Sequence, residues 1–229
     1  TPVTITPHSR FPLPPGLGLR ESMILGTAGF TAALALLRME DNRQTPALGP
    51  LAVTGATGGV GSLAIAIFAK AGYEVHAISG KADQAGYLTS LGASAVLGRD
   101  ALSTTRPMDA ARFGGGLDNV GGPMLAALLA QTAPYGNVAS AGLAASHELH
   151  ATVMPFIIRG VSLLGVASAG TARDLRDEVW RRLSSDWKPV GLDTICTRET
   201  GLDGLPAVFE TMLAGGSLGR TVVRLAEST

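Results

Sequence analysis

A short apolar run that breaks into glycines has the clearest chemical meaning in this sequence. Residues 51–53 have the pattern of a buried strand, and apolar side chains from Val60 onward recur at the spacing of one helix face. Four glycines accompany them, at Gly55, Gly58, Gly59 and Gly61. A strand, a glycine turn and a helix N-terminus can bind a dinucleotide pyrophosphate, because bare backbone approaches the phosphates and free N–H groups face them. The segment predicts such a site, although a glycine turn can also simply close a strand–helix corner.

The tip of the next strand indicates which dinucleotide would bind. Residues 73–79 are predicted as that strand, and Gly80 and Lys81 follow Ser79 at its end. A site for NAD places an acidic residue about 20 positions beyond the glycines, where it binds the ribose 2′-hydroxyl. No acid stands there, whereas Ser79 and Lys81 suit the 2′-phosphate of NADP, and Arg99 is a second cation for it. The alternative is that Lys81 and Arg99 are solvent-exposed surface charges that bind no phosphate.

The rest of the chain alternates strands with helices. Strands are predicted at residues 95–97, 116–120, 136–141 and 161–166, and helices at 20–40, 123–132 and 152–158. This alternation predicts an α/β fold, a doubly wound parallel sheet of the Rossmann type, with ligands at the carboxyl ends of its strands. Further on, helices are predicted at 171–185 and 202–214 and strands at 194–197 and 219–225. Gly26 and Gly29 inside the first helix indicate that a ligand or a packed helix approaches the backbone there.

Composition narrows the class of protein. The 229 residues are 46% hydrophobic and 16% charged, with eighteen basic residues against eighteen acidic ones, so nucleic acid is not an expected partner. No apolar run approaches the roughly 18 residues of a membrane span, and the start lacks a signal peptide, so we expect a cytoplasmic protein with no membrane partner. The single cysteine, Cys196, excludes an internal disulfide and a Cys-rich zinc site. His147 and His150 flank Glu148 without a third ligand in view, which favours a solvated loop over a metal site.

The glycine turn also fits the TGxxxGxG pattern of short-chain dehydrogenases, whose chemistry requires a lysine four residues after a catalytic tyrosine. The tyrosines, Tyr73, Tyr87 and Tyr135, are followed at that spacing by Ala77, Leu91 and Ala139. No lysine is placed to lower the pKa of a tyrosine for proton transfer, so this class is excluded.

Eight short motifs, in order, cover almost the whole chain. They are Ala28-Gly-Phe-Thr-Ala32, Gly55-Ala-Thr-Gly-Gly-Val-Gly61, Ser79-Gly-Lys81, Leu91-Gly-Ala93, Asp118-Asn-Val-Gly121, Ala141-Gly-Leu143, Met154-Pro-Phe-Ile157 and Gly219-Arg-Thr-Val-Val223. In this succession the sequence resembles the zinc-independent medium-chain dehydrogenases and reductases, within them the acryloyl-CoA reductase and quinone-oxidoreductase-like branch.

The resemblance implies a set of binding residues for NADPH and no metal site. The pyrophosphate would lie on Thr57, Gly58, Gly59 and Val60, and the adenosine 2′-phosphate on Ser79, Gly80, Lys81 and Arg99. The nicotinamide end would be lined by Leu143, Ile157 and Ser168, and Asp118 would shape the loop beneath it. The family usually has Arg in place of Lys81, and an ammonium lacks the fork that binds phosphate through two N–H groups. No catalytic residue is assigned.

The resemblance also implies a domain division, an activity and a partner. Residues 1–19 would be a lead-in left from a GroES-like substrate domain of on the order of a hundred residues, 20–170 an NADP-binding Rossmann domain, and 171–229 a return to the β-rich substrate domain. The expected reaction is hydride transfer to the alkene of an α,β-unsaturated carbonyl or enoyl thioester, or to a quinone. The alternative is a non-catalytic NADPH-binding sensor or interaction module. A strand at 161–166 on the sheet edge would pair with its copy in a homodimer.

Overall fold

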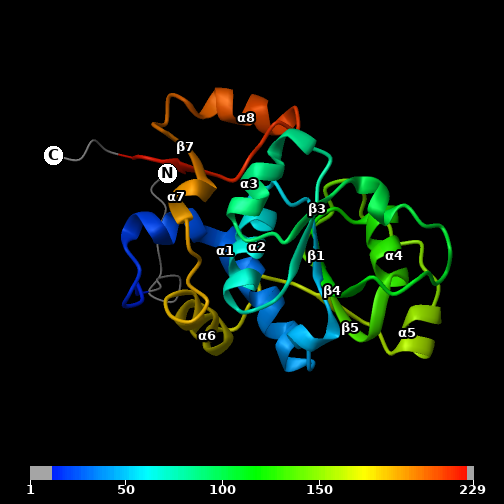
Figure 1. Ribbon diagram of the computed structural model, residues 1–229. Coiled ribbons are helices and arrows are strands. Elements are labelled where there is room, and N and C mark those ends of the chain that lie inside the picture. Colours follow the sequence, from blue (N-terminus) through cyan, green and yellow to red (C-terminus); the bar gives the residue numbers. More distant parts are fainter. Residues whose placement is uncertain (1–11, 226–229) are drawn as a thin grey trace.

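The computed structural model describes residues 12–225 and contains a central sheet of six parallel strands (Figure 1). Their order across the sheet is β3-β2-β1-β4-β5-β6. The strands are β1 (Leu51–Thr54), β2 (Val75–Ile78), β3 (Ala95–Leu97), β4 (Phe113–Asp118), β5 (Thr132–Ser140) and β6 (Ser162–Gly165). Strand order reverses between β1 and β4, which confirms the doubly wound fold and puts a crevice at their carboxyl ends.

Helices cover both faces of this sheet. One face carries α1 (Leu19–Asp41), α2 (Gly59–Lys70) and α3 (Ala85–Ser90), and the other carries α4 (Gly122–Ala130) and α5 (Met154–Arg159). Short 3-10 helices are η2 (Pro46–Leu48), η3 (Ala82–Gln84) and η4 (Arg99–Leu102). Alternate residues of β1 feed two cores: Leu51 and Val53 pack with α1 and α2, whereas Ala52 packs with α4.

Helix α1 bends at Gly26, where φ is 48° and ψ is −151°. A β-carbon on Gly26 would lie 3.0 Å from Nη2 of Arg220, and Nε of Arg220 donates to the carbonyl of Ile24 at 2.9 Å. The predicted close approach is therefore confirmed at Gly26 only, and the neighbour is an arginine side chain from β8 instead of a packed helix. At Gly29 the nearest atoms belong to Leu25 of the same helix.

By length and composition α1 could cross a membrane, so the prediction that no apolar run approaches a membrane span was wrong. However, 78% of its most apolar window is buried inside the fold. A helix that is apolar on all sides fits a protein core as well as a bilayer, and here the sheet and α2 cover it.

Strand β4 begins three residues earlier than the sequence predicted, at Phe113, and three glycines follow in it. A β-carbon on Gly115 would lie 2.4 Å from the carbonyl oxygen of Asn137, and one on Gly116 would lie 2.5 Å from that of Ala52. Only glycine fits between these neighbouring strands, so a run with low strand propensity forms the centre of the sheet.

Residues 173–223 form the C-terminal unit of the described chain, and its helices bury Leu183 and Ile195 in the same core as α1 and α2. It contains α6 (Arg173–Leu183), α7 (Leu192–Ile195), β7 (Cys196–Thr200), α8 (Leu205–Leu213) and β8 (Arg220–Val223), and β7 pairs with β8 in a two-stranded parallel sheet. The strand predicted at 194–197 starts later, because residues 192–195 close a helical turn first. In Figure 1 α8 lies at the upper edge of the molecule, and β8, drawn in red, runs below it towards the C-terminus.

A lead-in was predicted over residues 1–19, and its first eleven residues lie outside the described part of the chain. From Pro12 to Gly18 the chain has a turn and no helix or strand, and α1 begins at Leu19. The last four residues of the predicted segment 171–229 also lie outside.

Candidate functional site

The glycine turn after β1 is as tight as the sequence predicted. Gly55 has a φ of 59°, and the N–H of Gly58 donates to its carbonyl at 3.0 Å. A β-carbon on Gly61 would lie 2.3 Å from that same carbonyl oxygen. Helix α2 starts at Gly59 and its first internal hydrogen bond comes from Ser62, so the amides of residues 59–61 have no acceptor within the helix. These amides and the helix dipole form a site for an anion.

A pocket of about 700 Å³ lies beside this turn, between the ends of β2, β3 and β4. Among its lining residues are five of those predicted from the sequence: Thr57, Ser79, Gly80, Lys81 and Arg99. A β-carbon on Gly80 would lie only 2.5 Å from Nε of Arg99. Because Gly80 has no side chain, Lys81 and Arg99 can both line the same wall of the pocket. The backbone N–H of Lys81 donates to Oγ of Ser79 at 3.0 Å. None of the lining residues is a carboxylate.

Three residues near the chain end complete this region, and sequence reasoning did not assign them to the site. Nζ of Lys81 donates to the carbonyl of Ser217 at 2.7 Å, and the N–H of Gly219 donates to the carbonyl of Thr57 at 2.9 Å. Arg220 lies against the start of α2, since a β-carbon on Gly59 would be 3.1 Å from its Cδ. The motif Gly219-Arg-Thr-Val-Val223 is the sequence signal for this segment, but nothing in it shows that the segment reaches a glycine turn so distant in sequence.

Arg220 is half-buried, and its guanidinium donates to the carbonyl of Ile24, with no carboxylate within salt-bridge distance among residues 12–225. Burial lowers the pKa of its guanidinium from the usual value. A cation placed at a helix N-terminus without an acidic partner is costly unless an anion binds beside it.

The loop after β4 is held by the buried carboxyl of Asp118. Oγ1 of Thr54 donates to Oδ1 at 2.7 Å, and the N–H of Gly121 donates to Oδ2 at 2.7 Å. Burial raises the pKa of Asp118, and these hydrogen bonds act in the opposite direction. Asn119 adds a link from its amide Nδ2 to the carbonyl of Thr54 at 2.8 Å. The network fixes the floor of the crevice between β1 and β4.

Two of the residues predicted for the nicotinamide end lie at this edge of the sheet. Leu143 follows β5 and is 66% exposed. It lies close to the loop after β4, because a β-carbon added to Gly121 would be 3.5 Å from the Cα of Leu143. Ser168 follows β6, and its carbonyl accepts hydrogen bonds from Oγ1 of Thr171 and Nη2 of Arg176.

The structure does not bring Ile157 to the crevice. Ile157 lies on α5 and is 75% exposed. Arg159, two residues later, donates to the carbonyls of Thr132 at the start of β5 and Asp109 before β4. The end of α5 is therefore attached to the amino edge of the sheet, and the assignment of Ile157 to the nicotinamide stays a prediction.

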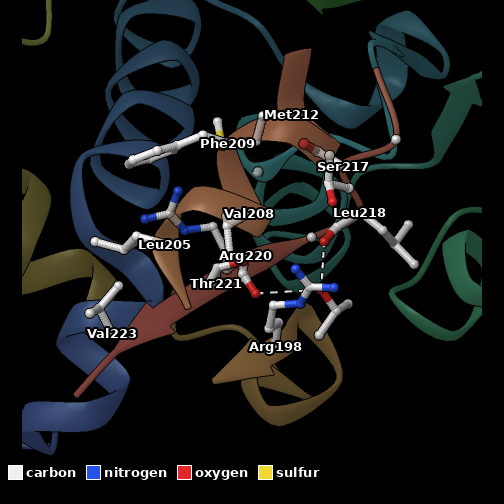
Figure 2. Close-up of a pocket in the computed structure, with 15 residues that line it drawn as sticks. Arg198, Leu205, Val208, Phe209, Met212, Ser217, Leu218, Arg220, Thr221 and Val223 are labelled. Atoms are coloured by element: carbon white, nitrogen blue, oxygen red, sulfur yellow. Dashed lines mark hydrogen bonds between the residues drawn. The ribbon is translucent and has the colours of Figure 1, made fainter. Parts of the chain in front are cut away.

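A second cleft, of about 390 Å³, lies between α8 and β8 (Figure 2). Leu205, Val208, Phe209 and Met212 of α8 form one wall, and Thr221 and Val223 of β8 form the other. Arg198 and Arg220 are the charged residues that line it, and Gly59 connects it to the start of α2. None of the other predicted site residues lines this cleft.

In the described part of the chain, no three His, Cys, Asp or Glu side chains are grouped as metal ligands would be. Nε2 of His150 lies 3.0 Å from Glu148, and both side chains are exposed.

The fold and the crevice define an NAD(P)-binding domain of the medium-chain reductase type, and comparison with known proteins agrees. The sequence profile of the zinc-binding dehydrogenase family matches residues 59–185, which is more than half of the chain. The chain belongs to this family.

Within the family, the chain falls in the zinc-independent branch of acryloyl-CoA reductases and quinone-oxidoreductase-like proteins. It is 45% identical over 216 residues to YhfP of Bacillus subtilis (strain 168), whose provisional name is quinone oxidoreductase, covering 93% of this chain and 66% of YhfP. It is 45% identical over 214 residues to the acrylyl-CoA reductase AcuI of Ruegeria pomeroyi, covering 93% of this chain and 64% of AcuI.

Solved structures resemble the fold closely. The crystal structure of Bacillus subtilis YhfP with NAD bound has a TM-score of 0.91 at 45% identity, covering 94% of this chain and 66% of that one. The structure of Escherichia coli K-12 YhdH with bound NADPH has a TM-score of 0.89 at 43% identity, covering 93% and 66%. This chain thus spans just under two thirds of the length of the relatives it matches.

Proposed function

We propose that this chain is the cofactor-binding part of an NADPH-dependent oxidoreductase. Its substrate would be an α,β-unsaturated carbonyl or enoyl thioester such as acryloyl-CoA, or a quinone. The names of AcuI and YhfP support both substrate classes, and the NADPH bound in YhdH supports the cofactor.

The observation that carries the proposal is the wall of the larger pocket, where Lys81 and Arg99 stand beside Ser79 without a carboxylate. Two cations and a hydroxyl complement the 2′-phosphate of NADPH. NADH has a hydroxyl at that position and would leave both cations without a counter-ion. YhfP was crystallised with NAD, so the preference of this chain for NADPH has to be measured.

The other parts of the site fit the rest of a dinucleotide. We place the pyrophosphate on Thr57, Gly58, Gly59 and Val60, where the free amides of α2 and the guanidinium of Arg220 converge. The nicotinamide would lie over the loop held by Asp118, with Leu143 and Ser168 beside it. Ile157, exposed on α5, stays a predicted third contact of the nicotinamide end.

NADPH, when bound, supplies a hydride from its nicotinamide ring. The protein binds the two phosphate groups at fixed points, the 2′-phosphate on Lys81 and Arg99 and the pyrophosphate on α2, so the ring can reach only one region of the crevice. The Asp118 network keeps the floor of that region rigid. Both effects hold the reactive carbon in place before a substrate arrives.

We also propose the domain division, the partner and the location that the resemblance implies. Residues 20–170 would form the cofactor domain, and the β7–β8 sheet would join a β-rich substrate domain. Strand β6 is an edge strand of the six-stranded sheet, and a homodimer would form there by pairing with its copy. A reaction that uses NADPH on a small thioester or quinone fits the cytoplasm.

The test is whether the protein oxidises NADPH in the presence of acryloyl-CoA or of a benzoquinone, followed by the loss of NADPH absorbance. We expect consumption with one of the two substrates, and a matched variant, Arg99→Met, should need a higher NADPH concentration for the same rate. Binding of NADPH without consumption of either compound would contradict a reductase and favour a non-catalytic sensor.

A further inference from the structure

The loop between α8 and β8, residues 214–219, connects the two parts of the cofactor site. At one end the carbonyl of Ser217 accepts a hydrogen bond from Nζ of Lys81 at 2.7 Å, in the wall of the larger pocket. At the other end the N–H of Gly219 donates to the carbonyl of Thr57 at 2.9 Å, in the glycine turn. The loop therefore contacts both the predicted 2′-phosphate site and the predicted pyrophosphate site.

The loop itself has little that fixes its shape. Gly215 has a φ of 70°, and both it and Gly216 are exposed. Their amides bond back to Met212 and Thr211 at the end of α8. Beyond them, Thr197 on β7 donates to the carbonyl of Leu218 at 2.6 Å. Because two glycines allow many backbone conformations, the position of residues 217–219 depends on these few anchors.

Lys81 can serve as an anchor and bind a phosphate at the same time. An ammonium has three N–H donors, and the carbonyl of Ser217 accepts one of them. The other two remain for a ligand in the pocket that Lys81 lines. Arg99 lines the same pocket, but the described structure records no hydrogen bond between its side chain and residues 214–219.

We propose that Lys81 is a positioning residue for the 214–219 loop, and through it sets the affinity for NADH as well as for NADPH. With Lys81 in place, the loop holds Gly219 on the glycine turn and Arg220 against the start of α2, where the pyrophosphate common to both cofactors binds. Without it, the loop loses its anchor at the adenosine end, and the pyrophosphate site loosens for either cofactor. Arg99, by contrast, discriminates only the 2′-phosphate.

This inference rests on the proposed function for its choice of cofactors. The first experiment is a calorimetric titration of the chain and four variants with NADPH and, separately, with NADH. Lys81→Met should weaken NADPH about twentyfold or more and NADH about fivefold, because it loses both the phosphate contact and the loop anchor. Arg99→Met should weaken NADPH about fivefold and change NADH by less than about twofold.

Two further variants serve as controls. Lys70 is exposed in the last turn of α2, away from the pocket, so Lys70→Met removes one positive charge and should change neither affinity. Lys81→Arg keeps a long donor and should restore NADH binding to within about twofold of the wild type. A Lys81→Met protein that loses affinity for NADPH alone would overturn the inference.

The second experiment requires no cofactor. Amide hydrogen exchange at Gly219, resolved by NMR, reports whether its bond to Thr57 is kept. We expect exchange about tenfold faster in Lys81→Met and unchanged in Arg99→Met. Equal exchange in Lys81→Met and the wild type would overturn the anchoring role. If the wild type binds neither nucleotide, the proposed function fails, and the exchange rate at Gly219 still decides whether Lys81 holds the loop.

Discussion

The two sheets of this molecule differ in how completely they are covered. Every residue of β1 and β4 is buried, because helices pack on both faces of the six-stranded sheet. No residue of β7 or β8 is buried, and α8 beside them leaves Phe209 53% and Leu213 90% exposed. One sheet is a closed core and the other is an open surface.

From this difference in burial we infer that the C-terminal unit is stabilised by its contacts with the core. A two-stranded sheet is at most marginally stable alone, so contacts with the larger sheet have to hold it. Val179, Leu183 and Ile195 of this unit are buried in the same core as α1 and α2. Three further contacts lie at the cofactor site: Gly219 on Thr57, Ser217 on Lys81, and Arg220 on Gly59. Its uncovered apolar side chains also fit the proposal that a substrate domain packs on α8 and β7.

The largest expected effect lies in the closed core. Phe68 on α2 is fully buried, so Phe68→Ala should reduce the free energy of unfolding by about 3–5 kcal/mol, measured by urea titration. The loss combines the transfer of the ring and the cavity left behind. A change below about 1 kcal/mol would contradict the view that α2 is packed on all sides.

A smaller effect is expected at the link between β1 and β4. Thr54→Val removes a hydroxyl that donates to Asp118 and accepts from Asn119, and should cost about 1–3 kcal/mol by the same measurement.

The cost should also depend on pH. Burial holds the pKa of Asp118 above its ordinary value, so the folded state loses stability as the pH rises through that pKa. The variant lacks a hydrogen bond that lowers this pKa, and its deficit should grow as the pH rises from about 4, the ordinary pKa of an aspartate, towards neutral. A deficit that shrinks over this range would mean that Thr54 does not stabilise the carboxylate.

Arg220 lies on β8 and contacts the start of α2, so it connects the two sheets. Its replacement should change cofactor affinity more than the stability of the fold. Arg220→Met should weaken NADPH and NADH alike by about tenfold, since the pyrophosphate loses a cation. Unfolding free energy should change by less than about 1 kcal/mol, because Arg220 has no acidic partner among the described residues and its burial is already costly. A large loss of stability with unchanged cofactor affinity would make Arg220 a structural residue only.

The smallest effect is expected on the open surface. Phe209→Ala, the same substitution as in α2 but on half-exposed α8, should reduce stability by less than about 1 kcal/mol. An equal loss of unfolding free energy in Phe209→Ala and Phe68→Ala would mean that α8 packs in a hydrophobic core of its own, which would contradict an open C-terminal surface.

Local patterns were enough to predict the six-stranded fold and most of one pocket wall. The glycine turn and the cations after β2 and β3 lie at strand ends, and parallel strands bring their carboxyl ends together. Strand β4 was placed three residues late because glycines carry no strand signal, although close backbone contact requires them.

Other parts of the site depend on tertiary contacts that no short motif records. Ser217 reaches Lys81, and Gly219 and Arg220 reach the glycine turn, because the C-terminal unit folds back onto α1 and α2. Ile157 was assigned by a motif, but the side of the sheet on which α5 is attached is set by Arg159 and its carbonyl partners.

The proposed preference for NADPH is tested most directly by a calorimetric titration of the wild-type chain with NADPH and with NADH. The arrangement of Ser79, Lys81 and Arg99 predicts that NADPH binds at least about tenfold more tightly, a difference of about 1.4 kcal/mol or more. Equal affinity for the two cofactors, or tighter binding of NADH, would contradict the assignment of that pocket wall to the 2′-phosphate.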